Sequence, residues 1–217
     1  MPISDVERQQ QIAKNREDSK PIIDDLAQIG IYVEWVSDLI YKYPSKYQTN
    51  HREIIPILLR WLPLIENPDV KEAIVRALSV PWAKGVAARP LIEEFRKAQE
   101  GRSLKWAIGN ALSVVADKSV FDELVELVRD KRHGKAREML PLALVKTKDP
   151  RVVSILIELL DDEEIAGHAV SALRRLAPPE ARIAIEPFIS HPKTWIRNEA
   201  KRALAKIDKK LARKPKA

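Results

Sequence analysis

The 217-residue sequence contains no cysteine and only six glycines, and it has no apolar run long enough to span a membrane. Without cysteine the chain has no disulfide framework, no cysteine nucleophile and no thiolate metal site. The scarcity of glycine disfavours strand-rich folds, which use glycine in turns and bulges. The first residues lack the apolar segment of a secretory signal. We therefore expect a helical cytoplasmic protein with no membrane association.

The positive charge is concentrated at one end of the chain. The formal net charge is +7, while residues 193–217 hold ten Lys or Arg against two Asp or Glu. Subtracting that local +8 leaves −1 for residues 1–192. Contact with nucleic acid, which depends on clustered cations, is therefore expected only near the C-terminal end.

A short repeat runs through most of the chain. The dipeptide Ala-Leu recurs at 77–78, 111–112, 143–144, 172–173 and 203–204, at intervals of 34, 32, 29 and 31 residues. The residue three positions before each alanine is apolar: Ile74, Ile108, Leu140, Ala169 and Ala200. This spacing is typical of a half-buried helix. A second apolar segment precedes each repeat, so the pattern predicts first helices over 52–65, 88–99, 120–129, 151–160 and 179–189.

The repeat resembles a known family. The segments 67–78, 149–173 and 191–204, each beginning with Asn-Pro, Asp-Pro or His-Pro, are similar to the short bacterial HEAT repeat of the PBS-lyase HEAT-like type. The resemblance covers about residues 50–208. It implies an all-α fold, an α-solenoid of about six HEAT-like helical hairpins whose units bury their apolar stripes against their neighbours.

The two ends depart from the pattern. We expect a polar N-terminal extension over 1–18, which forms a frayed helix or is disordered, and an atypical capping helix pair over 19–48, with helices at 21–30 and 32–43. Five HEAT-like repeats follow over 49–208. Residues 209–217 are expected to be a basic, disordered tail.

The resemblance places the second helix of each pair on the concave, binding side of the solenoid. Positions five and one before each Ala-Leu share a helix face because they are four residues apart. Together with one basic position, they give the candidate binding residues Glu72, Arg76, Trp106, Asn110, Arg137, Glu138, Ser171 and Arg202. An exposed tryptophan on such a face is a candidate hot spot. For any individual residue of this set, we favour the alternative of an ordinary solvated helix face.

Basic residues occupy the position six before the alanine in four of five repeats: Lys71, Lys105, Arg137 and Arg197. A ladder of phosphate-binding cations is one interpretation. We favour the other, in which these residues resemble the basic position of the HEAT consensus and pair with acids or turn carbonyls. The dense cluster over 129–137 is interpreted as a solvated turn, with an acidic partner as the alternative.

No catalytic or metal-binding motif is apparent. Phosphate loops, dinucleotide fingerprints, nucleophile elbows and zinc-protease motifs are all missing. Glu164 and His168 are spaced to share a helix face, but no second pair of ligands accompanies them. A HEAT-like DNA glycosylase or bilin lyase remains a minor alternative, and we expect no catalytic residue, metal or cofactor.

The sequence thus predicts a monomeric, non-catalytic scaffold that binds a protein or peptide. The alternative is a solenoid that binds nucleic acid through Arg197, Lys201, Arg202 and the basic C-terminal end.

Overall fold

The computed structural model describes residues 4–41, 52–99 and 103–213, and throughout these ranges the regular structure is helical, without a strand. The all-α prediction is therefore confirmed. The chain divides into two compact units, Met1–Val115 and Ala116–Ala217.

In the first unit the helices form neighbouring pairs. The elements are α1 (Asp5–Gln28), α2 (Asp38–Tyr41), α4 (Ile54–Trp61), α5 (Pro68–Leu78), the 3₁₀ turn η1 (Pro81–Ala83), α6 (Ala88–Lys97) and α7 (Ser103–Val115). Helix α5 packs against α4 and α7, and α7 packs against α6. The two second helices, α5 and α7, are thus direct neighbours.

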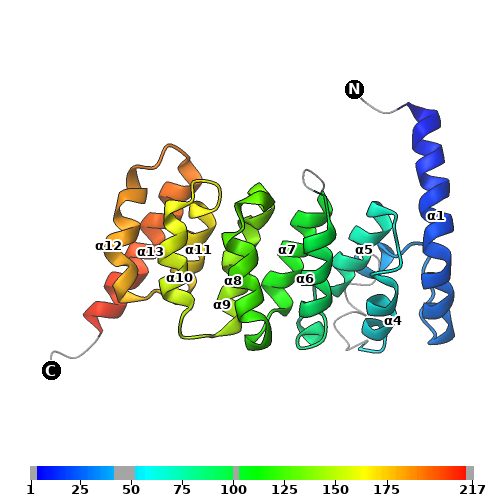
Figure 1. Ribbon diagram of the computed structural model, residues 1–217, viewed down its shortest axis with the longest axis horizontal. Helices are drawn as coiled ribbons and strands as arrows, with labels where there is room; N and C mark the ends of the chain where they lie inside the picture. The colour runs from blue at the N-terminus through cyan, green and yellow to red at the C-terminus, as the bar shows by residue number, and fades with distance from the viewer. Residues whose placement is uncertain (1–3, 42–51, 100–102, 214–217) are drawn as a thin grey trace. The chain divides into compact units, whose positions relative to one another are not determined.

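The second unit repeats this arrangement. Its elements are η2 (Lys118–Val120), α8 (Phe121–Arg129), η3 (Lys131–Met139), α9 (Leu140–Thr147), α10 (Val152–Glu158), η4 (Leu159–Asp161), α11 (Ala166–Leu176), η5 (Pro179–Ala181), α12 (Arg182–Ile185), η6 (Glu186–Ser190) and α13 (Thr194–Ala212). Pairs such as α10 with α11 and α12 with α13 lie side by side (Figure 1). The second helices α9, α11 and α13 pack in succession, with α11 in the middle.

The Ala-Leu steps lie in the core, as their spacing predicts. All five alanines are buried, and so are Leu78, Leu112, Leu144 and Leu173, whereas Leu204 in the last helix is only partly buried. The apolar residue three positions earlier is also buried in every repeat. A small alanine at this point lets neighbouring helices approach closely, while leucine fills the space beside it.

The N-terminal prediction was wrong about where the first helix begins. Residues 5–28 form one continuous helix instead of an extension followed by a helix that starts at Pro21. Ser4 and Glu7 form a reciprocal capping box that starts this helix. It continues through Pro21 because tertiary contacts hold it on both sides. Asn67 donates to Asn15 at 2.8 Å and to Asp18 at 2.7 Å, and Leu26 is buried.

The helix predicted over 32–43 is also shorter than expected. Among its described residues only Asp38–Tyr41 is helical. The Asp38 carboxylate accepts hydrogen bonds from the backbone amides of Glu34 and Trp35, at 3.0 and 3.1 Å, and so holds the preceding turn. Residues 42–48 lie outside the described ranges.

The prediction of a disordered tail from residue 209 was wrong for its described part. Helix α13 continues past Asp208 to Ala212. Lys206 donates to the backbone oxygens of Arg174 and Arg175, and Lys210 donates to that of Ala177, at 2.8 to 3.2 Å. These lysines satisfy carbonyls at the end of α11, where the helix dipole favours cations. Residues 214–217 lie outside the described ranges.

Candidate functional site

In the first unit, the predicted residues Glu72 and Arg76 are joined on α5. The Arg76 guanidinium donates two hydrogen bonds to one carboxylate oxygen of Glu72, at 2.8 and 2.6 Å. The Ser103 hydroxyl, at the start of α7, donates to the other oxygen. Glu72 therefore connects the two second helices, and its carboxylate is already engaged on both oxygens.

Trp106 lies on α7 one turn after Ser103, and 42% of its surface is exposed. Its neighbours in sequence, Lys105 and Ala107, are buried. Asn110 follows one turn later and is partly buried. We call the set Glu72, Arg76, Ser103, Trp106 and Asn110 the α5–α7 face. On this face the Trp106 indole is accessible, and the side chains of Glu72, Arg76 and Ser103 are hydrogen-bonded to one another.

In the second unit, Ser171 and Arg202 both donate to Glu199, a residue that the sequence analysis had not selected. The Glu199 carboxylate accepts from Arg174 at 2.7 Å and from Arg202 at 3.2 Å, and Ser171 also donates to it. Burial raises the pKa of Glu199, but these hydrogen bonds and the Arg174 charge outweigh it, so the pKa is lowered. Glu138 is partly buried in η3.

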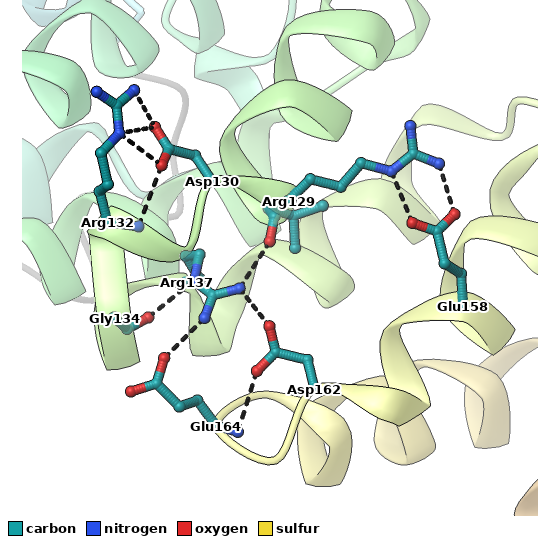
Figure 2. A network of polar contacts seen from close by, with 9 residues as sticks. Arg129, Asp130, Arg132, Gly134, Arg137, Glu158, Asp162 and Glu164 are labelled. Carbon is teal, nitrogen blue, oxygen red and sulfur yellow. Dashed lines mark hydrogen bonds and ion pairs between the residues drawn. The ribbon is translucent and has the colours of Figure 1, made fainter.

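Arg137 requires a correction: it is not a residue of an exposed binding face. Its side chain is completely buried. The guanidinium donates to the backbone oxygens of Gly134 and Val128, at 3.0 and 2.9 Å, and to the carboxylates of Asp162 and Glu164, both at 2.7 Å. Figure 2 shows these acceptors converging on the guanidinium. Arg137 therefore joins the loop before α9 to the loop before α11.

The charges around Arg137 are also paired (Figure 2). Arg129 donates to Glu158 at 2.9 and 2.5 Å, and Arg132 to Asp130 at 2.8 to 3.2 Å. Hydrogen bonding from Arg132 lowers the pKa of Asp130 to about 2. Burial alone would raise the pKa of Asp162, but the hydrogen bond and charge of Arg137 reverse that effect and lower it. Much of the basic cluster is therefore neutralised locally.

The other basic residues of the repeat have structural partners too. Lys71 of α5 binds the buried Glu94 of α6 at 2.6 Å. Lys105 is buried with its ammonium 5.3 Å from the centroid of the Phe95 ring. Arg197 donates to the backbone oxygens of His191 and Pro192, both at 2.8 Å, and to the Thr194 hydroxyl at 2.9 Å. Lys71, Arg137 and Arg197 thus have the carboxylate or turn-carbonyl partners that the structural interpretation predicts, whereas Lys105 lies over an aromatic ring.

A second exposed tryptophan was missed by the sequence analysis. Trp195 begins α13 and is 44% exposed. It lies against Gly167 of α11, where an added Cβ would be 2.3 Å from the indole Cη2. The His168 ring is tilted against it, with centroids 5.2 Å apart. The sequence feature that could have indicated this site is Gly167, which lies inside α11 at a position where the other repeats carry larger side chains.

The described histidines, His133, His168 and His191, lie apart from any ligand cluster. Glu164 binds Arg137 and His168 packs on Trp195, so these two do not act as a pair. His191 accepts a hydrogen bond from the Lys193 amide at 3.1 Å, just before α13. Within the described ranges, no group of three metal-ligating side chains is close enough to hold an ion. No helix in the same ranges is long and apolar enough to cross a membrane.

Comparison with known proteins gave no relative: no family model matches the chain, and no curated protein or solved structure does.

Proposed function

We propose that the chain is a non-catalytic HEAT-repeat scaffold, an α-solenoid of HEAT-like hairpins that binds a protein or peptide along its second helices. The observation that carries this proposal is Trp106. A large apolar side chain is left accessible at the middle of the α5–α7 face, where the surrounding charges are already satisfied. Exposed tryptophans of this kind are frequent hot spots in protein interfaces, because they bury a large area with few rotatable bonds.

Two further features support binding to protein over nucleic acid. The cations of the repeat position are engaged by carboxylates, ring faces or turn carbonyls. The C-terminal lysines Lys206 and Lys210 also bind carbonyls of α11. Phosphate tracking requires accessible cations in register with the backbone of the nucleic acid.

Affinity capture from the native cell extract tests the proposal with a matched pair of variants. Trp106→Ala is expected to lose the captured protein while its unfolding midpoint stays close to that of the wild type, since the indole is half exposed. Leu64→Ala removes another exposed apolar side chain of the first unit, in the turn between α4 and α5 and outside the α5–α7 face as defined above, and should retain the partner. Equal capture by both variants would remove the proposal, and a large loss of stability in Trp106→Ala would make Trp106 a core residue.

Nucleic acid binding is the second candidate, because Lys201, Lys209 and Arg213 on α13 are exposed. A gel-shift titration at about 50 and 200 mM salt distinguishes the two. Binding that weakens by orders of magnitude at the higher salt, and that disappears on deletion of 209–217, would favour nucleic acid.

A further inference from the structure

Helices α11 and α13 form a two-helix surface in the second unit. They run in the same direction, because contacts advance together along both helices: Gly167 meets Trp195, Arg174 meets Glu199, and Ala177 meets Lys210. Residues spaced by about one turn on their outer side make up what we call the α11–α13 face: His168, Ser171, Arg175, Trp195, Asn198, Arg202, Lys209 and Arg213.

One end of this face is apolar and preorganised. The Trp195 indole lies against Gly167, which the side chain of Ile196 also approaches, and the His168 ring packs against the indole. Although its position is fixed by these contacts, 44% of its surface remains accessible. A large side chain that is already ordered loses little entropy when a partner covers it, so Trp195 has the properties of an anchor.

The other end of the face is positive. Arg175, Arg202, Lys209 and Arg213 are exposed. Two acids of α13 are paired with arginines outside this face: Glu199 accepts from Arg174 at 2.7 Å and Asp208 accepts from Arg182. Arg202 also donates to Glu199, at a longer 3.2 Å, and 69% of its side chain stays exposed. At 1.5 Å per residue, Arg202 lies about 10 Å and Lys209 about 21 Å along the helix from Trp195. An aromatic anchor is thus followed by cations at a defined spacing.

This arrangement selects the chemistry of a partner. Resting on the protein-binding function proposed above, we propose that the α11–α13 face binds an acidic protein segment. The segment places a bulky apolar residue on Trp195 and carboxylates about 10 to 20 Å away, opposite Arg202 and Lys209. A basic segment would meet like charges at that end. Base stacking along a nucleic acid strand would require aromatic residues among the cations, and the face carries its one indole at the opposite end.

Selection from a random 12-residue phage-displayed peptide library on the full-length protein tests this proposal without assuming a sequence. The expected peptides contain Asp or Glu clustered several residues from a Trp, Phe, Leu or Ile. The affinity of a recovered peptide, measured by fluorescence anisotropy, should fall about 30-fold or more in Trp195→Ala, as expected for a hot spot. Arg202→Glu should weaken it about tenfold, and by a smaller factor in high salt.

Controls separate binding from folding. Lys118→Glu makes the same change of charge in η2 and should leave the affinity unchanged, and the unfolding midpoint of each variant is measured alongside. If Trp195→Ala lowers that midpoint, the inference is judged from the peptide affinity of Arg202→Glu alone, because Arg202 is exposed.

The outcomes distinguish the inference from the proposed function. Peptides that are acidic and sensitive to both substitutions support the inference. Peptides that bind but are neutral or basic, or that depend on Trp106 and not on Trp195, overturn the inference and leave the proposed function standing. Failure to select any peptide counts against both. A labelled oligothymidylate that binds the wild type more tightly than any peptide, and loses affinity in Arg202→Glu, assigns this face to nucleic acid instead.

Discussion

Replacing Arg137 by methionine is expected to destabilise the second unit strongly. Methionine fills a similar volume but removes every donor. The Asp162 carboxylate then keeps the hydrogen bond from the Glu164 amide but loses the guanidinium, and the carbonyls of Val128 and Gly134 lose the Arg137 donor. Asp162 is itself largely buried, with 13% of its side chain exposed. Breaking a buried ion pair by removing one member costs about 3–5 kcal/mol, because a charge is left buried and uncompensated.

The change in melting temperature follows from the size of the cooperative unit. For a domain of about 100 residues, 1 kcal/mol shifts the midpoint by roughly 4–8 °C. A loss of about 4 kcal/mol therefore lowers the midpoint of the second unit by about 15–30 °C. If the whole chain unfolds in one transition, the shift is about 8–16 °C.

Urea and thermal unfolding followed by circular dichroism at 222 nm measure the effect at neutral pH. Arg132→Met is the matched control, because Arg132 lies in the same segment and its side chain is 89% exposed. Its midpoint should stay near that of the wild type. Adding Asp162→Asn to Arg137→Met should recover about 1–2 kcal/mol, since the buried charge is removed. A wild-type midpoint for Arg137→Met alone would refute the assignment of Arg137 as a structural residue.

Two further predictions concern charged groups in the core. Lys71→Met should destabilise the first unit by about 1–3 kcal/mol in urea unfolding, because the buried Glu94 loses its contact at 2.6 Å. Lys97→Met, which removes the exposed partner of the same carboxylate, should cost clearly less; equal losses would contradict this. Burial lowers the pKa of His168, with a smaller raising effect from Glu138 and a lowering one from Lys193. The unfolded chain therefore binds the proton more readily below about pH 6.5, and stability should fall as the pH decreases through that range. His168→Gln should remove this part of the pH dependence, and an unchanged slope would show that His168 is not its source.

The repeat could be predicted from the sequence because it is a local pattern. Alanine, leucine and the apolar residue three positions earlier report directly which side of a helix is buried, and this assignment was confirmed in the core. The capping box at Ser4 and Glu7 was equally readable and was overlooked, since Pro21 was interpreted as the start of a helix. Proline is tolerated there because contacts to the α4–α5 loop hold the helix.

The role of Arg137 could not be read from its position in the repeat. Arg137 and Glu138 are adjacent in sequence, and one is fully buried while the other is partly exposed. Arg137 is the buried one because Asp162 and Glu164, about 25 residues later in the chain, accept hydrogen bonds from its guanidinium. A structural role was correctly predicted for the basic residue at this position of the repeat. The particular acceptors depend on how successive loops pack, which helical periodicity does not encode.

Trp195 was missed for a related reason. It lies eight residues before its Ala-Leu step, outside the positions that the sequence comparison selected. Its accessibility depends on Gly167, a residue of a different helix. Recognising such a site from the sequence requires a small residue in one helix to be matched with a large one in the next.

Hydrogen–deuterium exchange of the full-length chain, alone and with its captured partner, tests most directly where binding occurs. We expect slower exchange of backbone amides in second helices, in α5 and α7 or in α9, α11 and α13. The first helices α4, α6, α8, α10 and α12 should exchange at the same rates with and without the partner. Protection confined to the first helices would contradict the assignment of the binding surface.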